Sequence, residues 1–181
     1  IGIIGLGYVG LPLAIKYINK GVKVFGVDQD KSKIEKHKKG ISYIDSIKTN
    51  YFKKNPERVS TKYSLLKNCD IIFICLPTPL KNKKPDLSYI FGCAKNIRPN
   101  ISKGKLIILE STVYPGVTRE IKKIILEKNF EVGKDIFIGY SPERENPGDK
   151  KFSYKRTPKV ISGYTKNCLK LVDLVYSYIA G

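Results

Sequence analysis

Three glycines near the amino terminus are spaced in a way that suits phosphate binding. Gly5, Gly7 and Gly10 form the pattern GxGxxG directly after a short apolar run at residues 1–4. The first glycine permits a sharp turn, the second lets a diphosphate approach the backbone, and the third lets a helix pack closely on a strand. The diphosphate would meet free N–H groups at the positive end of the helix dipole. The pattern predicts a dinucleotide site, and the alternative is a glycine-rich turn that binds no ligand.

An acidic residue follows at the distance that a dinucleotide site requires. Asp28 lies 18 residues beyond Gly10, at the end of the apolar run 22–27. A carboxylate there can accept hydrogen bonds from the adenosine ribose and would repel a 2′-phosphate, which favours NAD over NADP. Lys31 and Lys33 weaken this argument, because either could pair with a phosphate. The alternative role for Asp28 is that of a helix N-cap.

Two threonines lie where parallel sheets bind their ligands. Thr78 belongs to the Pro-Thr-Pro sequence that ends the apolar run 70–76, and Thr112 follows the run 105–110. Ligands of such sheets bind outside the carboxyl ends of the strands. Each hydroxyl could therefore bond the cofactor ribose or the substrate, or could belong to an ordinary turn or N-cap.

An alternating series of strands and helices would hold these residues, since continuous apolar runs are typical of parallel strands buried on both faces. Strands are expected at residues 1–4, 22–27, 58–61, 70–76, 105–110, 136–140 and 159–162. Helices are expected at 9–19, 31–39, 87–96, 115–127 and 165–179, the last capped by Thr165. Residues 41–55 are a helix or an ordered loop, and the lysine-rich segments 81–84 and 149–155 are exposed loops. The order predicts an α/β fold of the Rossmann type, a doubly wound, mostly parallel sheet with helices on both faces.

The composition narrows the class of protein. The 181 residues suffice for one α/β domain, and no apolar run reaches the ~18 residues of a membrane span. There is no signal-peptide pattern and no initiating Met, so we expect a cytoplasmic protein with a few residues missing before Ile1. The four cysteines include no CxxC pair and the sequence has one histidine, so no metal site is expected.

The net charge of +18 has two interpretations. Lysines spread over solvated faces account for it, and such a surface also attracts phosphate-bearing ligands. A nucleic-acid binder would gather basic residues on one face with interleaved aromatics. The lysines of residues 31–39 lie on a predicted amphipathic helix that also carries Glu35, and the sequence has no RNA-binding or helix-turn-helix signature. We therefore expect no nucleic-acid partner.

Eight segments, taken together and in this order, resemble the UDP-glucose/GDP-mannose dehydrogenase family. They are GLGYVGLP at 5–12, Asp28, GISYI at 40–44, LPTPL at 76–80, PDLS at 85–88, ESTVYPG at 110–116, SPERENPG at 141–148 and KVISG at 159–163. No single motif is decisive, but the ordered set covers nearly the whole chain. Within the family, the combination of GLGYVGLP, LPTPL and SPERENPG is most similar to UDP-N-acetylhexosamine 6-dehydrogenases, such as those acting on UDP-N-acetylglucosamine.

The resemblance implies an enzyme that oxidises the C6 alcohol of a UDP-sugar to a carboxylate in two successive hydride transfers to NAD⁺. Tyr8 and Val9 would contact the pyrophosphate through their backbone, and Lys33 would lie beside Asp28. The threonines would line the nicotinamide side. The cofactor-binding residues that it implies are Gly5, Gly7, Tyr8, Val9, Gly10, Asp28, Lys33, Thr78 and Thr112.

The resemblance also implies a substrate side. Glu143 and Thr112 would lie near the reacting sugar, with Arg144 and Glu145 at the edge of the substrate. A carboxylate at the position of Glu143 could orient a water for the hydrolytic half of the reaction, which is a general-base role. The alternative is that Glu143 is a surface acid paired with Arg144.

The sequence departs from the family in one respect. Members carry a catalytic Cys, and a Lys and an Asn on a later helix, at positions beyond Gly181. None of the four cysteines here falls in the matching motif; they are Cys69, Cys75, Cys93 and Cys168. Residues 1–181 are therefore expected to be one NAD-binding domain, inactive alone, without the central helix and the C-terminal nucleotide-sugar domain. At full length the resemblance implies a homo-oligomer.

Two other classes of protein remain open. A hydroxyacid-type dehydrogenase would account for residues 5–28 but not for ESTVYPG or SPERENPG. A non-catalytic NAD-binding module is the second alternative.

Overall fold

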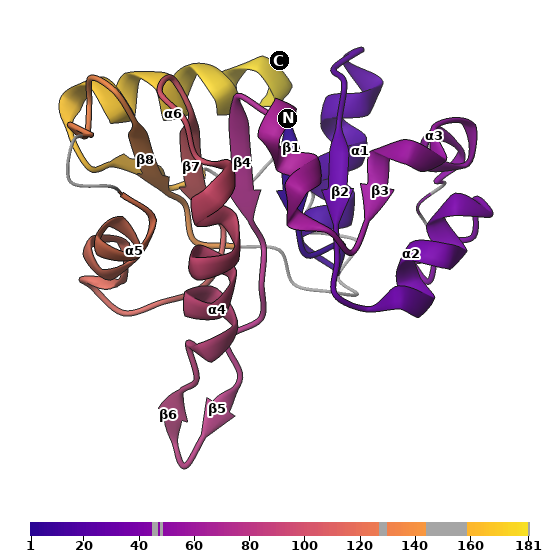
Figure 1. Cartoon of the computed structure of the whole chain (residues 1–181), viewed down its shortest axis with the longest axis horizontal. Helices are drawn as coiled ribbons and strands as arrows, with labels where there is room; N and C mark the ends of the chain where they lie inside the picture. Colours follow the sequence, from indigo (N-terminus) through magenta and orange to yellow (C-terminus); the bar gives the residue numbers. More distant parts are fainter. Residues whose placement is uncertain (45–46, 48, 127–129, 144–158, 181) are drawn as a thin grey trace.

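A seven-stranded sheet forms the centre of the structure (Figure 1). The computed structural model describes residues 1–44, 47, 49–126, 130–143 and 159–180. The strands are β1 (Gly2–Ile4), β2 (Phe25–Val27), β3 (Val59–Ser60), β4 (Ile71–Ile74), β7 (Leu106–Leu109), β8 (Phe137–Tyr140) and β9 (Ser162–Gly163). They lie in the order β3-β2-β1-β4-β7-β8-β9, and every neighbouring pair is parallel except β8 and β9. The expected doubly wound, mostly parallel sheet is confirmed.

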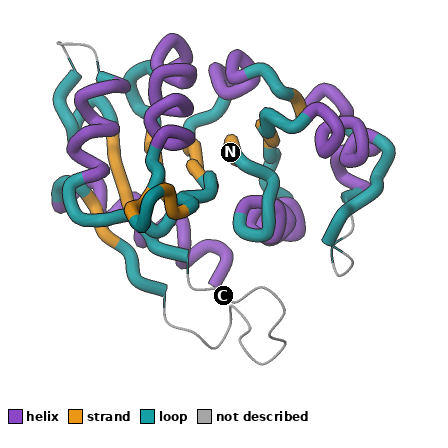
Figure 2. The backbone as a smooth tube through the Cα atoms, turned by 90° about the horizontal axis from the view of Figure 1, so that it is seen from below, coloured by secondary structure: helices purple, strands orange, loops and turns teal. Residues whose placement is uncertain are grey.

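Helices cover both faces of this sheet, as Figure 2 shows from below. The α-helices that the structure describes are α1 (Gly10–Asn19), α2 (Lys31–Lys38), α3 (Asn50–Lys54), α4 (Ser88–Ile97), α5 (Val117–Ile125) and α6 (Lys166–Ala180). Short 3₁₀ helices lie at Pro56–Arg58, Tyr63–Asn68 and Arg98–Asn100. Among the described helices, none is long and apolar enough to cross a membrane.

Successive residues of the central strands supply two separate cores. Ile72 and Ile74 of β4 pack in the core under α4 and α5, whereas Phe73 packs in the core under α1 and α6. All three side chains are fully buried. The Phe73 ring lies with its centroid 5.6 Å from that of Tyr17 on α1. Since neighbouring strand residues point to opposite faces, a strand covered on both faces needs a continuous apolar run.

Local signals in the sequence set the ends of the helices. Gly21 follows α1 with a φ of +79°, and its N–H donates to the Ile18 carbonyl at 2.9 Å. That left-handed conformation is one that glycine adopts without strain. Thr165 precedes α6, and its Oγ1 accepts a hydrogen bond from the Cys168 N–H at 3.2 Å. The expected N-cap of the last helix is therefore confirmed.

Two expectations about local structure are wrong. Residues 81–84 are not a loop but part of the antiparallel hairpin β5 (Leu80–Lys81) and β6 (Lys84–Pro85), which projects from the body of the molecule (Figure 1). The strand expected at 159–162 is shifted, because β9 contains Ser162–Gly163 and pairs antiparallel with β8. The loop expected at 149–155 lies outside the described residues.

Candidate cofactor and active site

The glycine-rich turn between β1 and α1 has the geometry that the GxGxxG pattern predicts. Gly5 has a φ of +86°, and a Cβ there would lie 2.4 Å from the carbonyl oxygen of Cys75. A Cβ on Gly10 would lie 1.9 Å from the Gly5 carbonyl oxygen, so the helix can begin this close to the strand only with glycine. A Cβ on Gly7 would have no described atom within 4 Å. The turn is thus closed at Gly5 and Gly10 and open at Gly7, where a diphosphate would approach.

The start of α1 lies beside this opening. There the Leu11 N–H donates to the Gly7 carbonyl at 3.0 Å and Pro12 has no N–H, so the N–H groups of Val9 and Gly10 would serve an anion. Val9 is the N-cap residue and supplies no side-chain hydrogen bond, and the first turn contains no acidic residue. The first N–H groups of a helix have no intrahelical acceptor, and the helix dipole makes this end positive. An anion such as a diphosphate can therefore bind here without displacing a side chain of α1. The Tyr8 side chain is exposed beside the turn.

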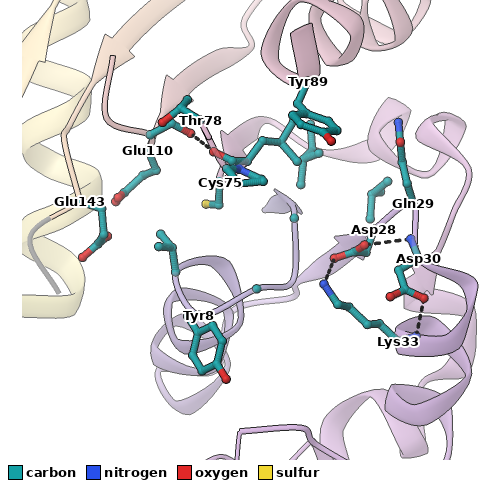
Figure 3. Close-up of a pocket in the computed structure, with 18 of the residues that line it drawn as sticks. Tyr8, Asp28, Gln29, Asp30, Lys33, Cys75, Thr78, Tyr89, Glu110 and Glu143 are labelled. Carbon is teal, nitrogen blue, oxygen red and sulfur yellow. Dashed lines mark hydrogen bonds and ion pairs between the residues drawn. The ribbon is translucent and has the colours of Figure 1, made fainter. Parts of the chain in front are cut away.

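Asp28 lies at the end of β2 and is bonded to the glycine-rich turn. Its Oδ2 accepts the Leu6 N–H at 2.9 Å. Its Oδ1 accepts the Asp30 N–H at 3.0 Å, and the Lys33 Nζ lies 3.8 Å from Oδ2 (Figure 3). A carboxylate has about four lone-pair positions, so room remains for the ribose hydroxyls. The N-cap of α2 is Asp30, whose side chain accepts the N–H groups of Ser32 and Lys33. The N-cap alternative for Asp28 is therefore wrong.

Lys33 lies beside Asp28, as expected. Its Nζ also lies over the Tyr43 ring, 5.4 Å from the centroid. The Tyr43 hydroxyl donates a hydrogen bond to the Leu6 carbonyl, and burial raises the Tyr43 pKa to about 12, so it stays a donor at neutral pH. Tyr43 thus ties the segment after α2 to the glycine-rich turn. From the sequence, Tyr43 received no role of its own and is named only as part of the family-like segment GISYI.

One cavity of about 570 Å³ connects these groups with the carboxyl ends of β4 and β7. It lies beside β1 and β4, where the strand order reverses, which is where doubly wound sheets bind their ligands. Figure 3 shows Asp28 and Lys33 on one side of it and Glu110 and Glu143 on the other. The residues expected to bind the cofactor that line it are Gly5, Gly7, Tyr8, Val9, Asp28, Lys33, Thr78 and Thr112.

The two threonines meet at the end of the central strands. The Thr78 hydroxyl donates to the Thr112 carbonyl at 2.9 Å, and the Ser111 hydroxyl donates to the Leu76 carbonyl at 2.7 Å. These bonds tie the segment after β4 to the segment after β7. Thr78 is therefore a linking residue in this structure, and its oxygen can still accept a bond. The Thr112 side chain is exposed at the cavity, and the ligand roles of both threonines stay predictions.

Glu143 lines the same cavity from the segment that follows β8. Its side chain is 16% exposed, and its Oε2 lies 3.9 Å from the Lys159 Nζ. A carboxylate in this position faces the cavity rather than bulk solvent. Arg144 and Glu145 lie outside the described residues, so their expected substrate contacts, and the alternative pairing of Glu143 with Arg144, stay predictions.

Sequence reasoning missed a buried polar cluster next to Glu143. Glu110, whose side chain is 1% exposed, accepts a hydrogen bond from the Tyr176 hydroxyl at 2.6 Å and pairs with the Lys159 Nζ at 3.0 Å. Burial raises the pKa of Glu110 to about 7 and raises the pKa of Tyr176. The available signals were two charged residues next to apolar segments, since Glu110 directly follows the apolar residues 106–109 and Lys159 is the first residue of KVISG. It did not show that the three residues meet.

The fold and site together define a Rossmann-type dinucleotide-binding domain. Its parallel strands follow the order β3-β2-β1-β4-β7-β8, which is the Rossmann order 3-2-1-4-5-6 when only the parallel strands are numbered along the chain. The turn, the uncapped helix and the carboxylate fit the diphosphate and ribose of the cofactor. Residues 1–180 match the model of the UDP-glucose/GDP-mannose dehydrogenase family, NAD binding domain. The chain belongs to this family, and its cofactor is NAD.

Known relatives agree in sequence and structure. The chain is 40% identical to Protein CapL of Staphylococcus aureus and 38% identical to UDP-N-acetyl-D-glucosamine 6-dehydrogenase of Pseudomonas aeruginosa, over 99% of this chain and 43% of each relative. It superposes on UDP-N-acetyl-mannosamine dehydrogenase Cap5O from Staphylococcus aureus with a TM-score of 0.87, at 30% identity over 98% of this chain and 44% of that one. The chain thus spans less than half the length of these relatives. The family match sets aside the hydroxyacid alternative.

Proposed function

We propose that the full-length protein oxidises the C6 alcohol of a UDP-sugar, namely a UDP-N-acetylhexosamine, to the uronic acid. Two relatives that match 98–99% of this chain are named for UDP-N-acetyl-D-glucosamine and UDP-N-acetyl-mannosamine. The observation that carries the proposal is the cavity that both Asp28 and Glu143 line. It offers a ribose-binding carboxylate at one end and a second carboxylate, for chemistry, at the other.

The residues of this chain would position the cofactor along that cavity. The Asp28 carboxylate would accept the adenosine ribose hydroxyls, and the first turn of α1 beside Gly7 would bind the diphosphate. Thr78 and Thr112 would then lie at the nicotinamide side. NAD⁺, when bound, supplies the hydride acceptor for each of the two oxidations.

Glu143 would act at the reacting sugar. Its carboxylate lines the cavity, where it could take a proton from a water that attacks C6 of the thioester formed by the family's catalytic Cys; the C6–S bond then breaks and the Cys leaves as its thiolate. Arg144 and Glu145 would contact the edge of the substrate. The named relatives differ in their sugar, and the part that would complete the substrate site lies outside this chain.

We further propose that residues 1–181 are one NAD-binding domain that cannot turn over alone, with the catalytic Cys and Lys of the family in the rest of the protein. The full-length protein would be a homo-oligomer in the cytoplasm and would bind no nucleic acid. A DNA titration at several salt concentrations checks the last point, because binding through phosphates weakens steeply with salt.

An NADH absorbance assay tests the proposal. The full-length protein is mixed with NAD⁺ and, separately, UDP-N-acetylglucosamine, UDP-N-acetylmannosamine, UDP-glucose or a 2-hydroxyacid. We expect NADH from a UDP-N-acetylhexosamine, with about two equivalents per sugar if each C6 alcohol is oxidised fully to a carboxylate. No NADH from any UDP-sugar would favour the non-catalytic NAD module. Turnover by the 181-residue chain alone would contradict the claim that it is incomplete.

A further inference from the structure

A lysine joins two carboxylates at the inner end of the cavity. The Lys159 Nζ lies 3.0 Å from Glu110 Oε1, 3.1 Å from Glu110 Oε2 and 3.9 Å from Glu143 Oε2. The side chains of Glu110, Lys159 and Glu143 are 1%, 16% and 16% exposed. The three residues come from the end of β7, the segment before β9 and the segment after β8. The fold therefore brings together charges that are far apart in the sequence.

Glu110 is the fixed member of this group. It directly follows β7, the strand between β4 and β8, and its Oε1 accepts the Tyr176 hydroxyl of α6 at 2.6 Å. The Lys159 ammonium also lies over the Tyr176 ring, 5.1 Å from the centroid. The Glu110 carboxylate and the Tyr176 ring thus hold the lysine. A side chain fixed in this way can in turn fix the group that it faces.

The charge balance shows what the lysine does for Glu143. The Glu110 and Glu143 carboxylates both lie near Lys159 in a largely desolvated place, and like charges there repel strongly. Lys159 lies within ion-pair distance of both, so it offsets that repulsion and draws Glu143 towards the anchored Glu110. If Lys159 served only to neutralise the buried Glu110, it would not need to lie near Glu143 as well. Here the lysine also faces a carboxylate that lines the cavity.

We propose that Lys159 is a positioning residue, which holds the Glu143 carboxylate in place at the reaction end of the cavity through its pair with Glu110. This inference rests on the proposed function, in which Glu143 handles the proton of the attacking water. Lys159 itself need touch neither substrate nor cofactor.

The kinetic test uses the full-length protein. Lys159→Met alone would leave Glu110 as a buried, uncompensated charge, so the main variant is Glu110→Gln/Lys159→Met, which removes both charges together. The control is Lys134→Met, since Lys134 makes an exposed pair with Glu131. We expect the double variant to lose roughly 10–100-fold in kcat, because small displacements of a catalytic group have effects of this size. The NAD⁺ affinity should change by less than about twofold, because the variant leaves Asp28 and the glycine-rich turn, which would bind the cofactor, unchanged.

A cycle with Glu143→Gln separates positioning from mere stability. If Lys159 acts through Glu143, the double variant should cost little further kcat in a Glu143→Gln background, because coupled residues are not additive. A folded double variant with the kcat of the parent protein would overturn the proposal. Fully additive losses would overturn it as well.

Crystal structures of the parent protein and of the double variant give a readout independent of turnover. We expect the Glu143 carboxylate to move by about 1 Å or more in the variant, the scale of displacement that matters for catalysis. An unmoved Glu143 would overturn the positioning role. If the parent protein oxidised no UDP-sugar, the proposed function would fail, and this displacement would still decide the role of Lys159.

Discussion

The Asp28 carboxylate accepts a hydrogen bond from the backbone N–H of Leu6 at 2.9 Å, across 22 residues of sequence. This bond joins the end of β2 to the glycine-rich turn, which are the two parts of the site that would hold the ribose and the diphosphate. Asp28 therefore has a structural role in addition to the binding role that we propose for it. The spacing between the two cofactor contacts is set before the cofactor binds, which lowers the ordering cost of binding.

Alanine at Gly7 and alanine at Gly10 should separate cofactor binding from folding. A Cβ on Gly7 has no described atom within 4 Å, so Gly7→Ala should change the free energy of unfolding by less than ~0.5 kcal/mol. The same methyl group would fill the space in which the diphosphate would approach the backbone. We therefore expect the NAD⁺ affinity to fall by about tenfold or more, which is a loss of about 1.4 kcal/mol of binding free energy. Calorimetry with NAD⁺ and urea unfolding measure the two effects. Unchanged affinity would contradict the assignment of Gly7.

Gly10 should show the opposite behaviour. A Cβ there would lie 1.9 Å from the Gly5 carbonyl oxygen, so α1 must move away from the turn. We expect Gly10→Ala to lower the free energy of unfolding by at least ~1–3 kcal/mol, the usual cost of overpacking. A stability equal to that of Gly7→Ala would show that the close approach of α1 is not needed.

Lys105 lies at the amino end of β7, away from the cavity, and is a buried lysine. Its ammonium donates hydrogen bonds to the carbonyls of Leu66, Lys67 and Cys69. We expect Lys105→Met to lower the free energy of unfolding by about 2–3 kcal/mol, because hydrogen bonds from a charged donor are lost and buried carbonyls are left unpaired. NAD⁺ affinity should not change. Lys103→Met is the control, since Lys103 makes only a surface ion pair and should cost less than ~1 kcal/mol.

Glu110 should make stability depend on pH in the opposite sense to most carboxylates. Its pKa is raised from 4.5 to about 7 by burial, so the folded state holds this proton more tightly than the unfolded chain. Between about pH 4.5 and pH 7, Glu110 therefore lowers stability as the pH rises, by on the order of 3 kcal/mol in total. Urea unfolding at pH 5 and 7.5 should show this fall in the parent protein and a smaller one in Glu110→Gln. Equal pH slopes in the two proteins would refute the burial of this charge.

Much of the fold follows from local patterns in the sequence. The apolar runs that contain β4 and β7 are continuous because both faces of these strands are covered, and that pattern indicates a parallel sheet. Gly5, Gly7, Gly10 and Asp28 could be assigned to a dinucleotide site because their roles depend on backbone geometry over a short stretch of chain. The cofactor half of the cavity was accordingly predictable.

Two features had no local signal. The β5–β6 hairpin turns at Asn82 and Lys83 with φ of +51° and +61°, but the segment lacks the glycine that usually marks such a turn. The group formed by Glu110, Lys159 and Tyr176 depends on how β7, the segment before β9 and α6 pack together. Lys159 lies 49 residues after Glu110 in the sequence, and Tyr176 lies 66 residues after it. Tertiary structure alone therefore brings these side chains into contact.

Isothermal calorimetry of the folded chain with NAD⁺, compared with its Asp28→Asn variant, tests the central claim most directly. The side-chain amide of that variant has one oxygen, so it can accept the Leu6 N–H or the Asp30 N–H but not both, and it has lost the charge that would bind the ribose hydroxyls. We expect measurable binding by the parent chain and by Lys134→Met, and an affinity roughly 10–100-fold lower for Asp28→Asn, as for a lost hydrogen bond to a charged group. No heat with NAD⁺ or NADH at millimolar concentration, or equal affinity in Asp28→Asn, would contradict the account.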